Sequence, residues 1–371
     1  MINVLYIVST LKRCGPTNQL SYIIKYLDKT KFFPIVLTLS PEPNIGSMKS
    51  YFEDDLGIKV CSLGLSRVKG LFFANSALNK FIKVNAIDLI HSQGIRADGL
   101  ASKVKIKTVA TLRNYPYLDY PMTYGKLRGF LMAKMHLNYL NKINSPVVVS
   151  KSVSRMLLNN KNYEIDYVQN GVDLERFPIT CKLDLREKLN IKSNAKVFIS
   201  VGHLSSRKDP LSIITAFQSA NIENSNLLFL GEGDLADDCN NLIDDDRIIL
   251  VGKVNNVTDY LMASDYFISA SLAEGLPNTV LEAMAAKLPC LLSDIPPHLE
   301  IAELGAIAPL IFKTQNVEDL KEKINNIIDC DYELMSSSSR QIIEQHLNAK
   351  SMSQCYQNKY LDLINYVGSK G

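Results

Sequence analysis

Two glutamates and a pair of adjacent cations are the residues in this chain whose types and spacing could do chemistry. Glu274 and Glu282 bound the segment EGLPNTVLE, and Arg207 and Lys208 follow one another in the segment GHLSSRKDP. A guanidinium beside an ammonium can hold a diphosphate, whereas carboxylates near such a site suit the neutral hydroxyls of the same ligand. The alternative is that the glutamates are solvated residues favoured by the dipole at a helix start, and that the cations are ordinary surface charges.

The surroundings of the two glutamates predict the elements that position them. Apolar runs at 265–270 and 289–294 indicate buried strands, and the apolar spacing between them predicts a helix over 278–287, capped by Asn278 or Thr279. This order places a loop at the carboxyl end of a strand, where open α/β sheets bind ligands. The N-terminus of the following helix adds free N–H groups and a partial positive charge, which suit a phosphate.

Three segments resemble signatures of one enzyme family. Glu274-Gly-Leu-Pro-Asn-Thr-Val-Leu-Glu282-Ala-Met-Ala is similar to the E-G-x-P-x-x-x-x-E-A-M-A donor-site pattern of the retaining glycosyltransferases of family 4. The segment NGVDLERF at 170–177 resembles their N-G-V-D-x-x-x-F pattern, and GHLSSRKD at 202–209 resembles G-R-L-x-x-x-K-G. The resemblance covers nearly the whole chain and implies the GT-B fold and a nucleotide-sugar substrate.

Each half of the chain contains at least six strand-then-helix patterns, which favour two doubly wound α/β domains. By resemblance these are Rossmann-like domains that face a cleft. We expect the acceptor-side domain to span 1–170 and the nucleotide-sugar domain to span 171–349. A C-terminal helix of about 350–371 is expected to pack back on the first domain.

The resemblance implies roles for individual residues. Glu274 would contact sugar hydroxyls and Glu282 would hold the ribose, while Lys208 and Arg207 would stabilise the pyrophosphate. Arg113 stands where many members have a histidine near the reacting sugar; it could pair with a phosphate or orient a hydroxyl, but it cannot be a general base. The expected catalytic set is Glu274, Lys208, Arg207 and Arg113, and the expected donor-binding set is Gly15, His203, Gly231, Val254, Gly275, Leu276, Pro277, Asn278, Thr279 and Glu282.

Three further positions depart from the family pattern. Gly15 is followed by proline where a pair of glycines is usual. His203 stands where an arginine is usual, and Arg207 is a candidate to replace that charge. Asp209 stands where a glycine is usual.

A tyrosine-rich segment follows Arg113. The stretch 114–124 holds four tyrosines and two prolines, a composition that predicts a loop able to stack on sugar rings, or else a loop packed on the domain by its rings. His91, at the carboxyl end of an expected strand, is either a site residue or a structural one. The expected acceptor-side residues are His91, Arg96, Asn114, Tyr115 and Tyr117.

Charge is distributed unevenly along the chain. Residues 1–170 carry 23 Lys and Arg against 10 Asp and Glu, whereas the rest carries 18 against 28, giving net charges of +13 and −10. The basic half suggests an anionic partner, either a membrane surface, a phosphorylated acceptor or nucleic acid, unless it is simply solvated. The apolar helix expected over 125–142 has basic edges, so it either lies on an anionic membrane or covers the core. No recognised nucleic-acid-binding module is evident, so nucleic acid is the least favoured partner.

Composition bounds the location and the cofactors. The seven cysteines form no C-x-x-C pair, the first apolar run has no preceding positive charge, and no apolar run reaches the ~18 residues of a membrane span. We therefore expect a cytoplasmic protein, peripheral on the inner face of the membrane at most. We expect no metal and no other cofactor.

The function implied is a retaining, metal-independent glycosyltransferase. It would move a sugar from a UDP- or GDP-sugar to a lipid-linked saccharide acceptor in the biosynthesis of a bacterial surface polysaccharide, such as O-antigen of lipopolysaccharide or capsule. Two alternatives are a nucleotide-sugar epimerase on the same scaffold and a non-catalytic partner subunit that binds nucleotide sugar or membrane.

Overall fold

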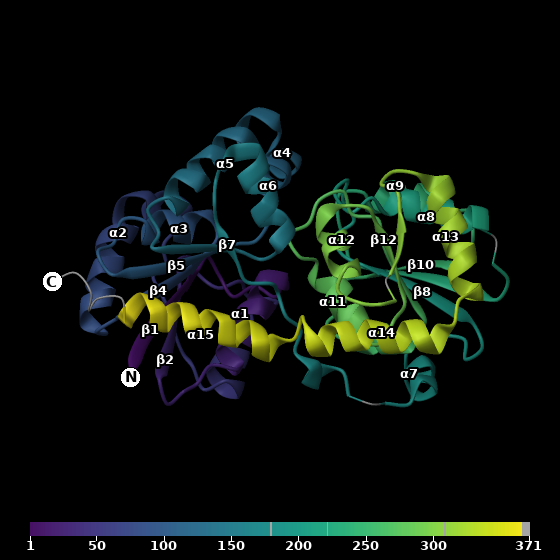
Figure 1. Ribbon diagram of the computed structural model, residues 1–371, viewed down its shortest axis with the longest axis horizontal. Helices are drawn as coiled ribbons and strands as arrows, with labels where there is room; N and C mark the ends of the chain where they lie inside the picture. The colour runs from purple at the N-terminus through teal and green to yellow at the C-terminus, as the bar shows by residue number, and fades with distance from the viewer. Residues whose placement is uncertain (179, 221, 308, 366–371) are drawn as a thin grey trace. The chain divides into compact units, whose positions relative to one another are not determined.

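The chain folds into two units in the computed structural model, which describes residues 1–178, 180–220, 222–307 and 309–365 (Figure 1). The first unit comprises Met1–Gly171 and Ala349–Gly371, and the second comprises Val172–Asn348. These boundaries lie one residue from those expected at 170/171 and 349/350. Residues 366–371 of the expected C-terminal helix lie outside the described residues.

The first unit is built on a parallel sheet with the order β3-β2-β1-β4-β5-β6-β7. β1 and β2 are mainly apolar runs, as expected for strands covered on both faces. β1 pairs with β2 and β4, so the chain reverses its direction of winding beside β1. The strands are β1 (Ile2–Val8), β2 (Phe32–Thr38), β3 (Lys59–Ser62), β4 (Leu89–Gln93), β5 (Lys107–Leu112), β6 (Ser145–Val148) and β7 (Asp166–Tyr167).

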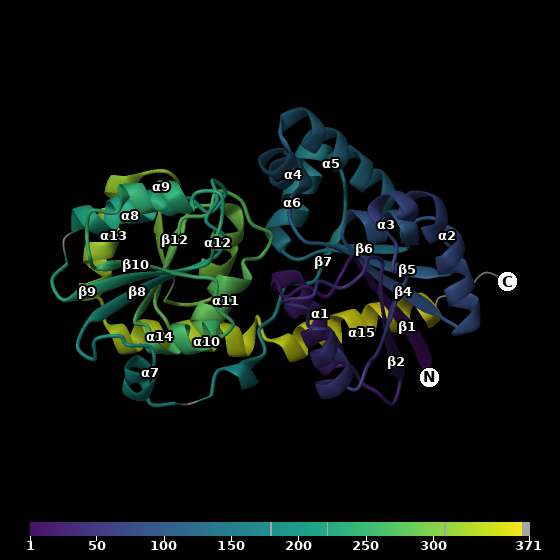
Figure 2. The same cartoon turned by 180° about the vertical axis from the view of Figure 1, so that it is seen from behind.

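Helices cover both faces of this sheet. α1 (Gly15–Lys25) and α15 (Ala349–Asn365) lie side by side on one face, as both views show (Figures 1 and 2). The other face packs against apolar residues of four helices, so the sheet lies between two separate cores. These four are α2 (Arg67–Val84), α3 (Ile95–Ala101), α5 (Lys126–Leu140) and α6 (Lys151–Lys161).

The tyrosine-rich segment is not a loop, contrary to expectation. It forms the helix α4 (Pro116–Tyr124), which has a proline in its first turn, where the missing N–H costs nothing. Pro121 lies inside this helix. Gly129 of α5 accommodates it, because a Cβ there would lie 2.3 Å from the backbone nitrogen of Pro121.

The second unit repeats the same winding, with the order β10-β9-β8-β11-β12-β13 and parallel pairing throughout. Its strands are β8 (Lys196–Val201), β9 (Ser225–Leu230), β10 (Ile248–Gly252), β11 (Tyr266–Ser269), β12 (Cys290–Ser293) and β13 (Leu310–Phe312). Its helices are α7 (Lys182–Lys188), α8 (Pro210–Ala220), α9 (Ala236–Leu242), α10 (Val257–Ala263), α11 (Asn278–Ala285), α12 (Pro296–Ala302), α13 (Val317–Asp329) and α14 (Tyr332–Gln345). The expected fold class, two doubly wound Rossmann-like units, is confirmed.

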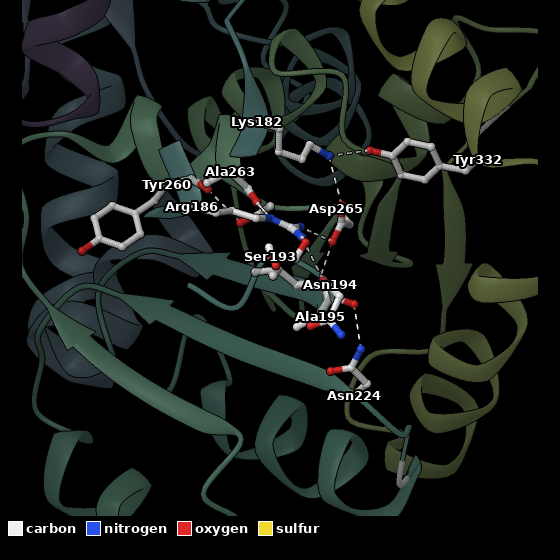
Figure 3. Close-up of polar contacts among 12 residues, drawn as sticks. Lys182, Arg186, Ser193, Asn194, Ala195, Asn224, Tyr260, Ala263, Asp265 and Tyr332 are labelled. Carbon is white, nitrogen blue, oxygen red and sulfur yellow. Dashed lines mark hydrogen bonds and ion pairs between the residues drawn. The ribbon is translucent and has the colours of Figure 1, made fainter. Parts of the chain in front are cut away.

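An ionic cluster fastens α7 to the amino ends of β8 and β11 (Figure 3). The Asp265 carboxylate lies 3.0 Å from Lys182 Nζ and 2.6 Å from Arg186 Nη2. It also accepts the N–H of Val197 at 2.8 Å, and Lys182 donates to the Tyr332 hydroxyl at 3.2 Å. This edge of the sheet is opposite to the one where doubly wound folds bind ligands, so we regard the cluster as structural.

In the described part of the chain, no helix has both the length and the apolar character needed to cross a bilayer.

Candidate functional site

The strongest candidate site lies in the second unit, at the carboxyl ends of β8 and β11. These are the neighbouring strands at which the sheet changes its direction of winding. Two loops meet there, 202–209 after β8 and 270–277 after β11. Open α/β sheets bind ligands at such a switch point, because the two loops diverge and leave space between them.

Three charged side chains from these loops converge. Both Lys208 Nζ, at 2.6 Å, and Arg207 Nη1, at 3.0 Å, contact the same carboxylate oxygen of Glu274, Oε1. The Glu274 side chain is 9% exposed, and those of Lys208 and Arg207 are 16% and 24% exposed. Burial alone would raise the pKa of the Glu274 carboxyl, but the charges of Lys208 and Arg207 lower it to about 2. The carboxylate is therefore charged at neutral pH.

Backbone contacts hold the two loops in register. The N–H of Leu272 donates to the Arg207 carbonyl at 2.8 Å, and Arg207 Nη1 donates to the Ala273 carbonyl at 2.8 Å. Arg207 thus connects the loops through its backbone and through its side chain. Arg207 and Lys208 differ in their contacts. Arg207 bonds to the loop backbone as well as to Glu274, whereas the ammonium group of Lys208 forms an ion pair only with Glu274 among the described side chains.

Glycines of the turn after β9 explain how the 202–209 loop is positioned. A Cβ at Gly231 would lie 1.9 Å from the Gly202 carbonyl oxygen, and one at Gly233 would lie 2.1 Å from that of Leu204. The N–H of Leu204 donates to the Glu232 carbonyl at 3.0 Å. The backbones of the two turns touch, so the glycines are needed for this approach whether or not a ligand is bound.

The helix that follows Glu274 begins as expected but is capped differently. α11 starts at Asn278 with Pro277 as its N-cap, and no side chain caps it, so neither Asn278 nor Thr279 has the capping role that we expected. Gly275, Leu276 and Pro277 are buried in the turn that leads into this helix start. A helix N-terminus without a side-chain cap can receive an anion.

Glu282, one turn into α11, is also paired. Arg176 Nη1 lies 3.0 Å from its Oε1 and Arg176 Nη2 donates to the Thr258 hydroxyl at 3.2 Å. Burial raises the pKa of Glu282, and the charge of Arg176 opposes that rise. Sequence reasoning placed Arg176 in the segment between the domains but did not identify it as the partner of Glu282.

His298 is a residue that sequence reasoning missed. Its ring is fully buried, and Nδ1 lies 2.9 Å from the Ser293 carbonyl oxygen, so Nδ1 carries the proton. The Ser293 hydroxyl donates to the Ser271 carbonyl at 2.6 Å, which connects His298 to the loop that bears Glu274. Burial lowers the pKa of His298 to about 4. Its Nε2 is buried and has no hydrogen-bond partner within the described residues.

The remaining residues expected on the donor side do not form part of the charged cluster. His203 is exposed, and its carbonyl accepts the Ser205 hydroxyl at 3.4 Å. Val254 lies in the turn after β10 and is partly exposed. Gly15 belongs to the first unit, where it is the first residue of α1, and Pro16 follows it inside the helix instead of in a loop.

Within the first unit, Arg113 lies just beyond β5. Its Nη2 donates to Gln93 Oε1 at 2.5 Å and its Nη1 to Asn170 Oδ1 at 3.2 Å. Both partners are neutral amides. Burial lowers the pKa of the guanidinium, although an arginine remains charged in proteins.

The contacts of His91 fit the structural alternative, and its expected contact with an acceptor stays a prediction. It is fully buried, with Nδ1 2.6 Å from the Tyr360 hydroxyl and Nε2 2.8 Å from the Thr111 hydroxyl. The Thr111 hydroxyl also lies 2.9 Å from that of Tyr356. Burial lowers the pKa of His91 to about 3, so a neutral ring connects β4 and β5 to α15.

The other acceptor-side residues mainly make contacts within the first unit. Arg96 donates to the Ser40 hydroxyl at 3.0 Å, and Asn114 donates to Asp119 at 3.0 Å. Tyr115 is buried, so packing describes it better than recognition. Tyr117 is partly exposed. Lys161 Nζ lies 4.1 Å above its ring.

Within the described residues, no group of three or more His, Cys, Asp or Glu side chains could hold a metal ion. The charged cluster of the second unit offers electrostatic chemistry. Lys208 and the start of α11 can stabilise an oxyanion, and Glu274, held ionised, can accept hydrogen bonds from hydroxyls.

Two protein-family models match the chain. The model described as "Glycosyl transferases group 1" matches residues 182–346, which hold the charged cluster, and "Glycosyltransferase Family 4" matches residues 15–176. Together they span most of both units.

Three similar proteins illustrate the likeness. An O-antigen biosynthesis glycosyltransferase, WclY of Escherichia coli, is 23% identical over 99% of this chain and 100% of its own length. A UDP-Gal:α-D-GlcNAc-diphosphoundecaprenol α-1,3-galactosyltransferase of Escherichia coli is 28% identical over 59% of this chain, which spans 61% of that protein. The crystal structure of Anabaena HepE in complex with UDP-glucose superposes with a TM-score of 0.82 at 16% identity, over 97% of this chain and 99% of HepE. This last likeness shows the fold.

Proposed function

Because this chain belongs to the glycosyltransferases that the group 1 and family 4 models describe, we propose that it transfers a sugar from a nucleotide sugar to a saccharide acceptor, retaining the configuration at the anomeric carbon and using no metal. The resemblance expected from the segment 274–285 is confirmed by these matches. The O-antigen biosynthesis relative named above supplies the wider setting, the synthesis of bacterial surface polysaccharide.

The observation that carries the proposal is the cluster of Lys208, Arg207 and Glu274 beside the start of α11. The cations and the helix N–H groups would stabilise the negative charge that grows on the diphosphate as the glycosidic bond breaks. Glu274 would orient the sugar by accepting its hydroxyls. The incoming hydroxyl would attack from the face that the diphosphate leaves, since no carboxylate nucleophile is assigned.

The substrates proposed follow from the similar proteins. HepE was crystallised with UDP-glucose, so a UDP-sugar is the donor to test first. The galactosyltransferase relative acts on a sugar attached to diphosphoundecaprenol, which supports a lipid-linked acceptor here.

A thermal-shift titration with UDP, GDP, ADP and their sugars, without metal, tests the donor site. We expect one nucleotide to stabilise the wild type by about 2.7 kcal/mol at 100 times its dissociation constant, and Lys208→Ala to respond much less. Lys313→Ala, which removes an exposed lysine of the same unit, is the control. Transfer by Lys208→Ala should fall at least ~100-fold; unchanged turnover in that variant would contradict the assignment.

We also propose that the first unit contacts an anionic membrane surface from the cytoplasmic side. Large apolar side chains are exposed at the start of α2, where Leu71, Phe72 and Phe73 are 82%, 75% and 61% exposed, and on α5, where Leu127 is 76% exposed. Exposed lysines also lie on both helices, at 69, 80 and 83 of α2 and at 126 and 134 of α5, and this combination suits anionic headgroups over acyl chains.

Flotation with phosphatidylglycerol vesicles tests this contact. A double substitution, Leu71→Ser with Phe72→Ser, should weaken binding at least ~10-fold, because two apolar side chains no longer enter the membrane. Val84→Ser, which alters an exposed apolar residue at the other end of α2, should bind like the wild type. Equal binding by the double variant and the wild type would remove α2 from the proposed contact.

A further inference from the structure

Arg113 is a largely buried cation that meets only neutral partners. Its two terminal nitrogens donate to the amide oxygens of Gln93 and Asn170, and its Nε is buried without a partner. None of the ion pairs within 4.0 Å among the described residues involves Arg113. A buried charge that lacks a counter-ion costs free energy, so such an arrangement is expected where a ligand supplies the opposite charge.

The carboxylate of Asp98 does not neutralise Arg113, because it has other partners. Asp98 acts on the guanidinium only at longer range. One of its oxygens accepts the Ser92 hydroxyl at 2.6 Å, and the other lies 2.7 Å from His136 Nε2. Asp98 is fully buried in these contacts, so its charge is shared with groups closer than Arg113.

Gln93 gives a second, independent sign of a missing acceptor. Its side chain is 7% exposed, and its Nε2 is buried without a hydrogen-bond partner. Because its Oε1 accepts from Arg113 at 2.5 Å, the amide cannot turn round to satisfy Nε2 without losing that bond. Gln93 therefore holds spare N–H donors, as Arg113 does at Nε, whereas the one acceptor atom of the pair, Gln93 Oε1, already accepts from Arg113.

The position in the fold also suits a ligand. Gln93 ends β4 and Arg113 follows β5, so both lie at the carboxyl edge of the first sheet. Asn170 precedes Gly171, whose carbonyl accepts Gln19 Nε2 of α1 at 2.8 Å, so the same segment is anchored to α1. Arg113 is partly exposed, so an incoming group can reach it.

We propose that Arg113 and Gln93 bind an anionic group, a carboxylate or a phosphate, of one of the substrates of the proposed transferase. An oxyanion is the ligand that matches a set of spare donors carrying one positive charge. A carboxylate would come from an acidic sugar, and a phosphate from the diphosphate of a lipid-linked acceptor. This inference rests on the proposed function for the name of the substrates, but not for the anion site itself.

The first test isolates this site from that of the second unit. In a Lys208→Met background, inorganic phosphate, pyrophosphate and glucuronate are titrated against the full chain by calorimetry and thermal shift. We expect at least one anion to bind, and the further change Arg113→Met to weaken it at least ~10-fold, the loss expected for one charge-assisted contact. Arg155→Met, which removes an exposed arginine of the same unit, should leave binding unchanged.

The anions distinguish the two sources. Tighter binding of glucuronate points to an acidic sugar, and tighter binding of phosphate or pyrophosphate points to the acceptor's diphosphate. If no anion distinguishes the variant with Arg113 from the variant without it, the inference is overturned. UDP binding by the wild type and by Lys208→Met is measured in parallel. If the wild type binds no UDP, the proposed function is contradicted, but the result for the anions at Arg113 still stands.

The second test supplies the missing counter-ion within the chain. Gln93→Glu places a carboxylate where Gln93 Oε1 now lies, next to Arg113. We expect the unliganded variant to melt above the wild type at pH 7 and to lose its response to the anions. The new counter-ion alone would raise the melting temperature, so the anion response decides: a purely structural Gln93 and Arg113 pair predicts that Gln93→Glu and its parent respond equally to the anions. This variant keeps the test decisive even if Arg113→Met folds poorly.

Discussion

Replacing Glu274 by glutamine should separate the stability of the second unit from its capacity to bind a nucleotide. The substitution keeps the shape of the side chain and removes the charge that Lys208 and Arg207 share. Two largely buried cations then lack their counter-ion. The second unit should unfold more easily, while the ammonium of Lys208 becomes free for a diphosphate.

The magnitude follows from the pKa of Glu274. That pKa falls from its ordinary 4.5 to about 2 in the folded chain, and at 1.36 kcal/mol per pKa unit the ionised carboxylate contributes about 3 kcal/mol. This value agrees with the roughly 3–5 kcal/mol of stability that is lost when one partner of a buried ion pair is removed. For a unit that spans Val172–Asn348, each kcal/mol lowers the melting temperature by ~2–4 °C, so we expect a loss of ~6–12 °C.

The direction in which stability changes with pH is a second check. A depressed carboxyl pKa stabilises the fold above about pH 4.5, and this contribution disappears as the pH falls towards 2. The difference in melting temperature between wild type and Glu274→Gln should therefore be full at pH 7 and shrink progressively below pH 4.5. Glu303→Gln, which alters an exposed glutamate just after α12, is the matched control and should change stability by less than ~0.5 kcal/mol.

The assay combines calorimetric melting with nucleotide titration. We expect Glu274→Gln to bind the preferred nucleoside diphosphate at least as tightly as the wild type, and to lose most of its transfer activity. Melting within 1 °C of the wild type at pH 7, or a difference that persists unchanged below pH 3, would refute the reasoning from the ion pairs.

Three further predictions concern residues around the sites. Gly231→Ala should lower the melting temperature and weaken nucleotide binding, because its Cβ would lie 1.9 Å from the Gly202 carbonyl oxygen; unchanged values in both assays would contradict the close approach. The wild type should lose stability as the pH falls from 6.5 to 4, because His298 has a pKa of about 4 in the folded chain and the unfolded chain takes up the proton first. In His298→Gln the melting temperature should fall less over the same pH range. Tyr360→Phe should cost ~1–3 kcal/mol in urea unfolding by leaving His91 Nδ1 unpaired, and an unaltered midpoint would exclude the buried network.

The strands and ligand-facing loops could be predicted because their signals are local. An apolar run followed by a glycine turn and a helical pattern is contained in about 20 residues, and the strands expected at 265–270 and 289–294 match β11 and β12 to within one residue at each end. The segment 114–124 shows where a local rule fails. Its prolines indicated a loop, but one stands in the first turn of α4, where it is harmless, and the other is accommodated by Gly129.

The contacts that define the sites are not local, which is why they escaped prediction. His91 bonds to Tyr360, 269 residues further on, and no pattern around His91 indicates that α15 will cover it. Arg207 reaches the carbonyl of Ala273, 66 residues away. His298 escaped for a related reason: its significance lies in a nitrogen without a partner, and only the surrounding side chains reveal that.

Asp209 and His203 both depart from the family pattern, but the two departures differ in their structural consequences. Asp209 has a φ of +48°, in the left-handed region that glycine occupies freely and that aspartate tolerates better than most residues. Its carboxylate also accepts the Ser212 hydroxyl at 2.7 Å in the first turn of α8, so the substitution keeps the backbone path and adds a capping contact.

The change at 203 is not compensated in this way, because the guanidinium of Arg207 is already bound to the Ala273 carbonyl and to Glu274. If the second unit binds a diphosphate as proposed, we therefore expect it to depend more heavily on Lys208 here than it would beside an arginine at position 203, and we expect Lys208 to be the most sensitive single position for donor binding.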